Sequence, residues 1–291
     1  MSNSTDPFSQ FPESVRARMK RQTLSCTYLQ LGDPIDSELA MFKSFVDTNE
    51  EMLVKYFVES NEEVDAQLKA GVPDDRFDAS ALQWTEAFGR ATHYCQLLLL
   101  VTMLERFLNR LANDVDRLFN DLNLTNELAE LKKERGGSMT ARLVEFVTQS
   151  SACAFPINPD LWEVISDLLW TRNRIVHEGG FFLFDASSDQ AVLSDAGSST
   201  KAKKAAQKAI KRHDVDLLRA SRNLARDGFG LLPADSFPNP RVDYEITISS
   251  DYVLGMVKNV REFVESMSEG FQIAVRRKIE EIHVGPRLVT E

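Results

Sequence analysis

The strongest constraint on the fold is the stretch LWEVISDLLWTRNRIVHEGG, from Leu161 to Gly180, which predicts one amphipathic helix. Asn158 can cap its start through a side-chain oxygen, and Pro159 suits the first helical position because no acceptor exists there for an N–H. Gly179 and Gly180 end it, since helices usually stop at a residue that tolerates positive φ. A helix of about 20 residues is about 30 Å long, enough to cross a small domain.

Polar side chains fall on two faces of this predicted helix. Arg172 lies in the middle of an apolar stripe formed by Leu161, Ile165, Leu168, Leu169, Ile175 and Val176. Asn173 and His177 are four residues apart and therefore share a face. A guanidinium in a packing stripe is costly unless an anion or a strong hydrogen-bond acceptor meets it. Either a buried acid of the chain or a ligand must therefore meet Arg172.

Helical periodicity also covers most of the remaining chain. One pattern runs from Asp36 to a stop at residues 71–73, and Ser80 opens a longer one that reaches about Asn120. Further helices are expected at about 126–135, at about 139–150, and from Ser250 or Asp251 to about Ile282. The segments between them are predicted as an apolar run that packs on the helices (181–184), a Gly- and Pro-rich loop (227–241) and a short extended piece (244–249).

We therefore predict an all-α, up-and-down helical bundle with a partly disordered basic insertion. The expected parts are a flexible N-terminal arm (1–35), an N-terminal helical extension (36–79), the bundle (80–185 plus 241–285) and the insertion (186–240). The insertion carries a predicted basic helix at residues 201–213, which contains no acidic residue.

Composition limits the classes of function. The three cysteines form no CxxC pair and no signal peptide is evident, so we expect reduced thiols and a cytoplasmic protein. The longest apolar run, Leu97 to Leu104, is too short to cross a membrane. The net charge of −10 argues against indiscriminate binding of nucleic acid, so any RNA site must be a local basic feature.

Common motifs for metals, nucleotide cofactors and acyl transfer are missing from the sequence. The four histidines stand singly, and no HExxH, Cys/His cluster, P-loop, GxGxxG or GxSxG occurs. We therefore expect no metal and no cofactor. Arg277 and His283 also form an R-x(5)-H pattern near the C-terminus, but no polar residue follows that arginine, so we interpret this match as chance.

Arg172-Asn173-x-x-x-His177 resembles the R-x(4–6)-H motif of the HEPN superfamily, whose RNase members carry Arg, a polar residue that is often Asn, and His. A preceding long helix containing Leu104–Leu108, the Gly-Gly after the motif and a closing segment at Tyr244–Met267 extend the likeness to residues 80–185 and 241–275. The resemblance implies a HEPN-like bundle and a homodimeric, metal-independent endoribonuclease of toxin or antiviral-defence type. A cognate antitoxin or regulatory protein would be its partner.

The chemistry of the motif suits RNA cleavage through the 2′-hydroxyl to 2′,3′-cyclic phosphate ends. Histidine transfers protons near neutral pH, and the arginine fork matches phosphate oxygens. Asn173 can orient either group. The helix end and the adjacent Glu178 both favour the imidazolium form of His177. Since each chain supplies one such histidine, a two-fold dimer would provide the second.

Three questions stay open at this level. Glu105 is the best internal candidate to pair with Arg172, and such a buried pair would also suit a purely structural scaffold. A non-catalytic HEPN-like module that binds a nucleotide or protein is a further alternative. The basic segment could contact RNA or form a solvated surface helix; the candidate RNA-binding residues are Arg174, Lys203, Lys204, Lys208, Lys211 and Arg212.

Overall fold

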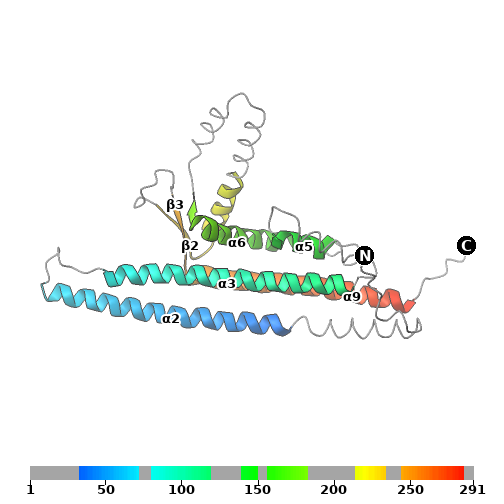
Figure 1. Ribbon diagram of the computed structural model, residues 1–291, viewed down its shortest axis with the longest axis horizontal. Helices are drawn as coiled ribbons and strands as arrows, with labels where there is room; N and C mark the ends of the chain where they lie inside the picture. The colour runs from blue at the N-terminus through cyan, green and yellow to red at the C-terminus, as the bar shows by residue number, and fades with distance from the viewer. Residues whose placement is uncertain are drawn as a thin grey trace, which may run out of the picture. The chain divides into compact units, whose positions relative to one another are not determined.

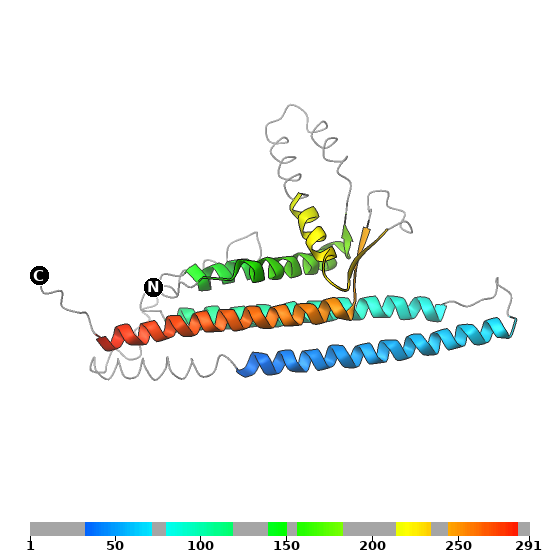
Figure 2. The same cartoon turned by 180° about the vertical axis from the view of Figure 1, so that it is seen from behind.

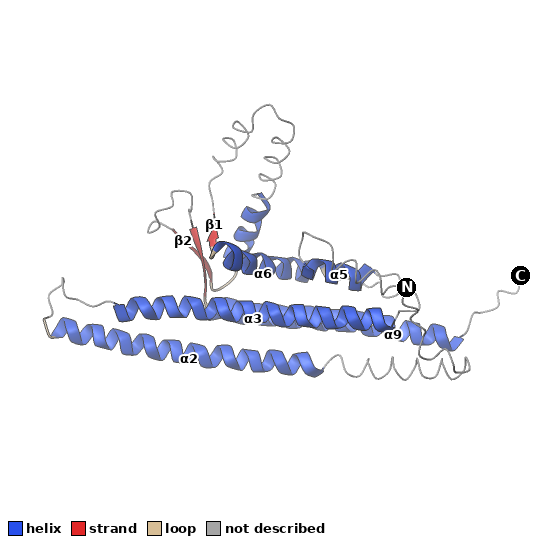
Figure 3. Ribbon diagram, in the orientation of Figure 1, coloured by secondary structure: helices blue, strands red, loops and turns tan. Residues whose placement is uncertain are grey.

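The computed structural model describes residues 33–71, 80–118, 139–149, 156–182, 214–233 and 244–284. This part of the chain is predominantly helical, which confirms the predicted all-α class (Figure 1, Figure 3). A helix at residues 214–224, named helix 214–224 below, accompanies the long elements. Their bounds are α2 (Asp33–Lys69), α3 (Ser80–Leu118), α5 (Met139–Gln149), α6 (Pro159–Glu178) and α9 (Ser250–Val284). The helix expected at 126–135, the basic helix at 201–213 and the N-terminal arm up to residue 32 lie outside the described residues.

The predicted signals at both ends of α6 are confirmed. The Asn158 Oδ1 atom accepts hydrogen bonds from the backbone N–H groups of Asp160 at 3.0 Å and Leu161 at 3.4 Å. At the other end Gly179 and Gly180 have φ values of 65° and 86°. The N–H of Gly180 donates to the carbonyl of Arg174 at 3.0 Å, so the two glycines turn the chain away from the helix axis.

A small antiparallel sheet follows α6, in the strand order β1-β3-β2. The strands are β1 (Phe181–Phe182), β2 (Phe229–Pro233) and β3 (Tyr244–Ile248). The extended piece expected at 244–249 is confirmed as β3. The loop expected at 227–241 is wrong for residues 229–233, which pair with β3 from Phe229↔Ile248 to Pro233↔Tyr244.

The glycine and proline that suggested a loop have strand-specific roles in β2. Pro233 is the last residue of an edge strand, where a missing N–H costs little. A Cβ on Gly230 would approach the Thr247 Oγ1 atom to 2.7 Å, so glycine permits close pairing with β3. The Gly and Pro content of residues 229–233 therefore indicated a loop, although these residues form an edge strand.

The chain divides into two compact units, and the first consists of residues 1–40, 102–162 and 260–291. Its core contains the buried side chains Leu39, Leu104, Leu108, Leu111, Val115, Leu143, Val147, Met267 and Phe271. The rings of Trp162 and Phe263 stack with their centroids 6.0 Å apart. This unit therefore owes its core to the C-terminal half of α3 together with α5 and α9.

The second unit, residues 41–101 and 163–259, contains the sheet and most of α6. Within it α2 runs alongside α3, as the views from both sides show (Figure 1, Figure 2), and His93 Nε2 lies 3.1 Å from Glu50 Oε2. Its core contains Val46, Leu53, Leu97, Leu100, Val101, Ile165, Leu168, Ile246, Val253 and Val257. Within the described residues, no helix combines the length and the apolar character needed to span a membrane.

Candidate functional site

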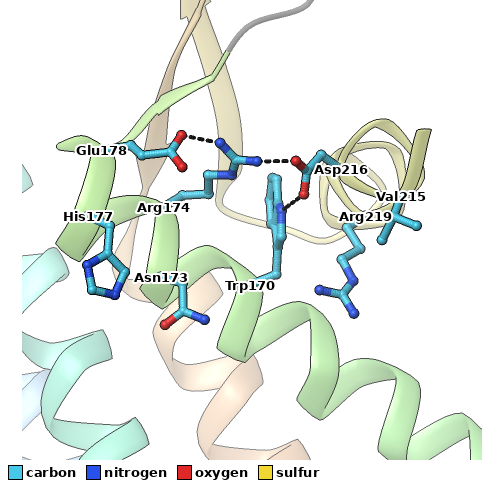
Figure 4. Close-up of a pocket in the computed structure, with 8 residues that line it drawn as sticks. All are labelled: Trp170, Asn173, Arg174, His177, Glu178, Val215, Asp216 and Arg219. Atoms are coloured by element: carbon cyan, nitrogen blue, oxygen red, sulfur yellow. Dashed lines mark hydrogen bonds and ion pairs between the residues drawn. The ribbon is translucent and has the colours of Figure 1, made fainter. Parts of the chain in front are cut away.

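An open pocket of about 450 Å³ lies in the second unit, beside the last turns of α6 (Figure 4). Two elements far apart in the sequence form it: α6 and helix 214–224. Its lining residues are Trp170, Asn173, Arg174, His177, Glu178, Val215, Asp216 and Arg219. The structure thus brings two motif residues, Asn173 and His177, to one cavity with side chains from the expected insertion.

A buried carboxylate fixes helix 214–224 against α6. The side chain of Asp167 is fully buried and accepts from Arg222 Nε at 2.9 Å and from Arg226 Nη2 at 2.9 Å. Arg222 also donates to the second Asp167 oxygen and pairs with Glu163. The hydrogen bond to Asp167 raises the pKa of Arg222 above its ordinary value. Two arginines therefore neutralise one buried acid of α6. We call this group of Asp167, Arg222 and Arg226 the Asp167 anchor.

A second layer of polar contacts continues this anchor toward α9. The Tyr252 hydroxyl donates to Asn223 Oδ1 at 2.9 Å, and Asn223 Nδ2 donates to Thr171 Oγ1 at 3.3 Å. Burial raises the pKa of Tyr252, so this hydroxyl keeps its proton as a donor. Arg226 Nη1 donates to the same Asn223 oxygen at 2.6 Å. The buried groups of Tyr252, Asn223 and Thr171 satisfy one another and, with the partly exposed Arg226, hold the end of helix 214–224 in place.

Arg174 forms one wall of the pocket and is already bonded to two carboxylates. Its guanidinium donates to Asp216 and to Glu178, and its Cζ lies 5.7 Å from the centroid of the Trp170 ring. The indole N–H of Trp170 donates to the other Asp216 oxygen at 2.7 Å. Arg174 and Glu178 are therefore tied into the pocket wall, and direct contact of Arg174 with RNA stays a prediction.

The three motif residues lie together at the end of α6. Arg172 Nη1 donates to Asn173 Oδ1 at 2.9 Å, while the Arg172 side chain itself does not line the pocket. His177 lines the pocket and is exposed, with no hydrogen-bond or ion-pair partner among the described residues. The Asn173 carbonyl is occupied by Arg172, which leaves the amide N–H₂ as the donor that it can offer to the pocket.

The other predicted site residues have varied positions. Glu105 belongs to the first unit, where its Oε1 atom accepts from the Thr140 hydroxyl at 3.2 Å. Its pairing with Arg172 of the second unit stays a prediction. The basic residues Lys203, Lys204, Lys208, Lys211 and Arg212 lie outside the described residues. Within the described ranges no group of three or more His, Cys, Asp or Glu side chains is placed to hold a metal ion.

Tyr94 braces the turn that follows the motif. Its hydroxyl donates to the Ile246 carbonyl, and the Ile246 N–H donates to the Gly180 carbonyl at 2.8 Å. A Cβ on Gly180 would come within 2.9 Å of the Tyr94 hydroxyl oxygen, and the φ of 86° at this position is one that other residues rarely adopt, so the turn favours glycine. Burial raises the pKa of Tyr94 to about 12, which keeps the hydroxyl protonated at neutral pH.

Sequence reasoning missed the Asp167 anchor and Arg219. Asp167 stands directly before Leu168 and Leu169 on a helix with a buried stripe, and a charge at that place needs a cationic partner. The sequence also spaces Arg222 and Arg226 by four residues, a spacing that in a helix places both side chains on one face.

No family model, no curated protein and no solved structure matches this sequence.

Proposed function

We propose that this protein is a metal-independent endoribonuclease that acts as a homodimer in the cytoplasm. It would cleave RNA through the 2′-hydroxyl and leave 2′,3′-cyclic phosphate ends, as a toxin or antiviral-defence effector. The observation that carries the proposal is the position of Asn173 and His177 in one open pocket, with Arg172 bonded to Asn173 at 2.9 Å.

The pocket has properties that an RNA-cleaving site needs. Its volume of about 450 Å³ falls within the usual range for small-molecule sites, so a nucleotide-sized group fits. His177 is exposed and has no bonded partner among the described residues, which leaves both ring nitrogens available for proton transfer. The imidazole is therefore not committed to a structural role within that part of the chain.

The proposed reaction is an internal displacement at phosphorus. A base takes the 2′-hydroxyl proton, the 2′-oxygen bonds to phosphorus, and the bond from phosphorus to the 5′-oxygen breaks. The leaving 5′-oxygen receives a proton from an acid. Arg172 lies beside the pocket, bonded to Asn173, and would stabilise the negative charge on a phosphorane held where two subunits meet at the ends of their α6 helices. One histidine can act as base and another as acid.

A dimer would complete this pair of proton-transfer groups. His177 of one subunit would serve as base and His177 of a second copy as acid, around one shared phosphate. Sedimentation equilibrium measures the assembly directly, because the chain has a mass of 32.9 kDa and a dimer has twice that mass. A monomer under conditions where RNA is cleaved would contradict the shared site.

The cleavage test compares wild type with three variants on single-stranded RNA. His177→Ala and Arg172→Ala should each lower the rate at least about 100-fold, as expected when an acid–base group or a charge-stabilising donor is lost. His283→Ala is the matched control, since it removes the histidine of the second R-x(5)-H pattern, and it should cleave as wild type does. The product ends should be cyclic phosphates, which resist phosphatase until acid opens them.

The same experiment separates cleavage from binding alone. A substrate with a 2′-deoxy sugar at the cleaved position should bind and stay intact, because it lacks the attacking oxygen. Full activity of His177→Ala would remove the mechanism. RNA binding without cleavage by the wild-type protein would favour the non-catalytic binding module.

A further inference from the structure

We propose that Arg219 of helix 214–224 binds a phosphate of the RNA chain in the pocket, so that the insertion supplies part of the substrate site. The inference rests on the proposed function, since the ligand is a nucleic acid phosphodiester. It assigns to Arg219 a binding role that no motif in the sequence indicates.

The first support is the contrast between the two arginines that line the pocket. Arg174 is bonded to Asp216 and Glu178, and its side chain is only 12% exposed. Arg219 lines the same pocket, is half-buried, and has no hydrogen-bond or ion-pair partner among the described residues. A guanidinium at a pocket wall without a protein partner leaves all five of its donors available to a ligand.

The second support is the direction of the side chain. Figure 4 shows the Arg219 guanidinium pointing away from the bonded group of Arg174, Asp216 and Glu178, in the same direction as the Asn173 and His177 side chains, which lie on the other side of the Trp170 ring. Asn173 can add an amide N–H₂ donor there, because its carbonyl accepts from Arg172. A neutral and a cationic donor thus both line the cavity, apart from the bonded carboxylates.

The third support is the rigidity of the element that carries Arg219. Asp167 is fully buried and bonded to Arg222, about one turn beyond Arg219 on helix 214–224, and to Arg226, which follows the end of that helix. A side chain held on an anchored helix loses less entropy on binding than one on a loop. The contacts of Asp167 therefore hold Arg219 at the wall of the pocket that Asn173 and His177 also line.

The chemistry of this side of the pocket suits a phosphodiester. A guanidinium fork donates two parallel hydrogen bonds to phosphate oxygens and stays charged at any physiological pH. The two carboxylates of the pocket would repel a phosphate, but both are bonded to Arg174. Arg219 therefore supplies the positive charge that faces an incoming anion, and its contact is with the substrate itself.

The test measures binding apart from cleavage, with a short single-stranded 2′-deoxy oligonucleotide as the probe. Such a probe keeps the phosphates and cannot be cleaved through the 2′-hydroxyl. Arg219→Ala should raise its Kd about tenfold, as expected for a lost charge-assisted hydrogen bond. It should also lower the slope of log Kd against log salt concentration by about 0.7, the value for one phosphate contact on a single strand.

Arg110→Ala is the matched control, because Arg110 is an exposed arginine outside the pocket and has no partner among the described residues. It should leave both Kd and salt slope as in wild type. Thermal unfolding checks that each variant folds, and Arg219→Gln, of similar length, replaces Arg219→Ala if the alanine variant unfolds. Wild-type affinity and salt slope in the folded variant would overturn the proposal.

Competition with inorganic phosphate distinguishes a chain phosphodiester from a free phosphate. The oligonucleotide should compete at much lower concentration than inorganic phosphate, and equal potency would overturn the assignment to a nucleic acid chain. If Arg219→Ala weakens binding while RNA stays uncut by wild type, the phosphate site stands and the nuclease function fails. If wild type cleaves RNA and Arg219→Ala binds and cleaves equally well, the nuclease function stands and the Arg219 phosphate site fails.

Discussion

Arg222 donates to both carboxylate oxygens of Asp167, a side chain that is fully buried in α6. Replacing Asp167 with Asn removes the negative charge and leaves Arg222 and Arg226 facing a neutral amide. We expect a loss of about 2–4 kcal/mol in the free energy of unfolding, at the lower part of the range for a broken buried pair because both arginines are partly exposed. Chemical denaturation measures this loss.

A second aspartate of the same helix provides the comparison for Asp167→Asn. Asp160 is exposed in the first turn of α6, where a negative charge gains only a weak interaction with the helix dipole. Asp160→Asn should therefore cost less than about 1 kcal/mol. Equal losses for the two variants would show that Asp167 contributes no more than a surface charge.

Gly228 precedes β2 and has a φ of +75°. A Cβ at this position would lie 2.5 Å from the backbone nitrogen of Tyr252, an atom that cannot move without displacing α9. An alanine in the left-handed conformation costs about 1–2 kcal/mol from its backbone alone. Because the Cβ also meets the Tyr252 nitrogen, Gly228→Ala should lower the free energy of unfolding by more than this amount. Thermal or chemical unfolding reports the change.

Gly255 is the matched glycine within α9. It has space for a Cβ, and alanine is the better helix former, so Gly255→Ala should leave stability unchanged or raise it by up to about 1 kcal/mol. A loss of stability in this variant as large as in Gly228→Ala would mean that close packing at Gly228 does not explain the result.

Ionisation of Tyr94 should lower the free energy of unfolding at high pH. Its pKa is raised to about 12 by burial, while an unfolded tyrosine ionises near 10. Because the pKa is raised in the folded protein, the neutral hydroxyl makes its full contribution to the free energy of unfolding below about pH 10, and this contribution is lost as pH rises toward about 12. Denaturation at a series of pH values should show this decline in wild type.

Tyr94→Phe should remove that part of the decline and cost about 1 kcal/mol at neutral pH, because the hydrogen bond to the Ile246 carbonyl is lost. Tyr56→Phe changes an exposed ring and should leave neutral-pH stability as in wild type. Identical profiles of stability against pH for wild type and Tyr94→Phe would contradict the assignment to Tyr94.

A metal chelator should not inhibit RNA cleavage. In the proposed mechanism His177 moves protons and Arg172 stabilises charge, so no step draws on a bound cation. Cleavage rates with EDTA and without it should agree within error. Inhibition that Mg²⁺ or Zn²⁺ reverses would require a different mechanism.

The sequence allowed the helical parts to be predicted well because their signals are local. Asn158 caps α6 through its own neighbours, and Gly179 and Gly180 end it through their own backbone. The position of Asn173 and His177 on one face followed from helical spacing alone. Such features need no knowledge of distant contacts.

The missed features all depend on partners far along the chain. Arg222 lies 55 residues from Asp167, and β2 becomes a strand because β3 supplies its hydrogen bonds. Arg219 lines the pocket because helix 214–224 lies beside α6 in the folded chain. Spacing within a segment cannot reveal such pairings, and a Gly-Pro composition favoured the wrong local structure for residues 229–233.

The strand order β1-β3-β2 has a consequence for variation of this chain. β1 and β2 flank the same central strand, so the segment between Phe182 and residue 214 starts and returns at elements tied to one scaffold. The entropy of closing such a segment grows only slowly with its length, by about 0.6 kcal/mol per doubling. A change in the number of residues between β1 and helix 214–224 should therefore cost little stability, because both flanking elements belong to one scaffold.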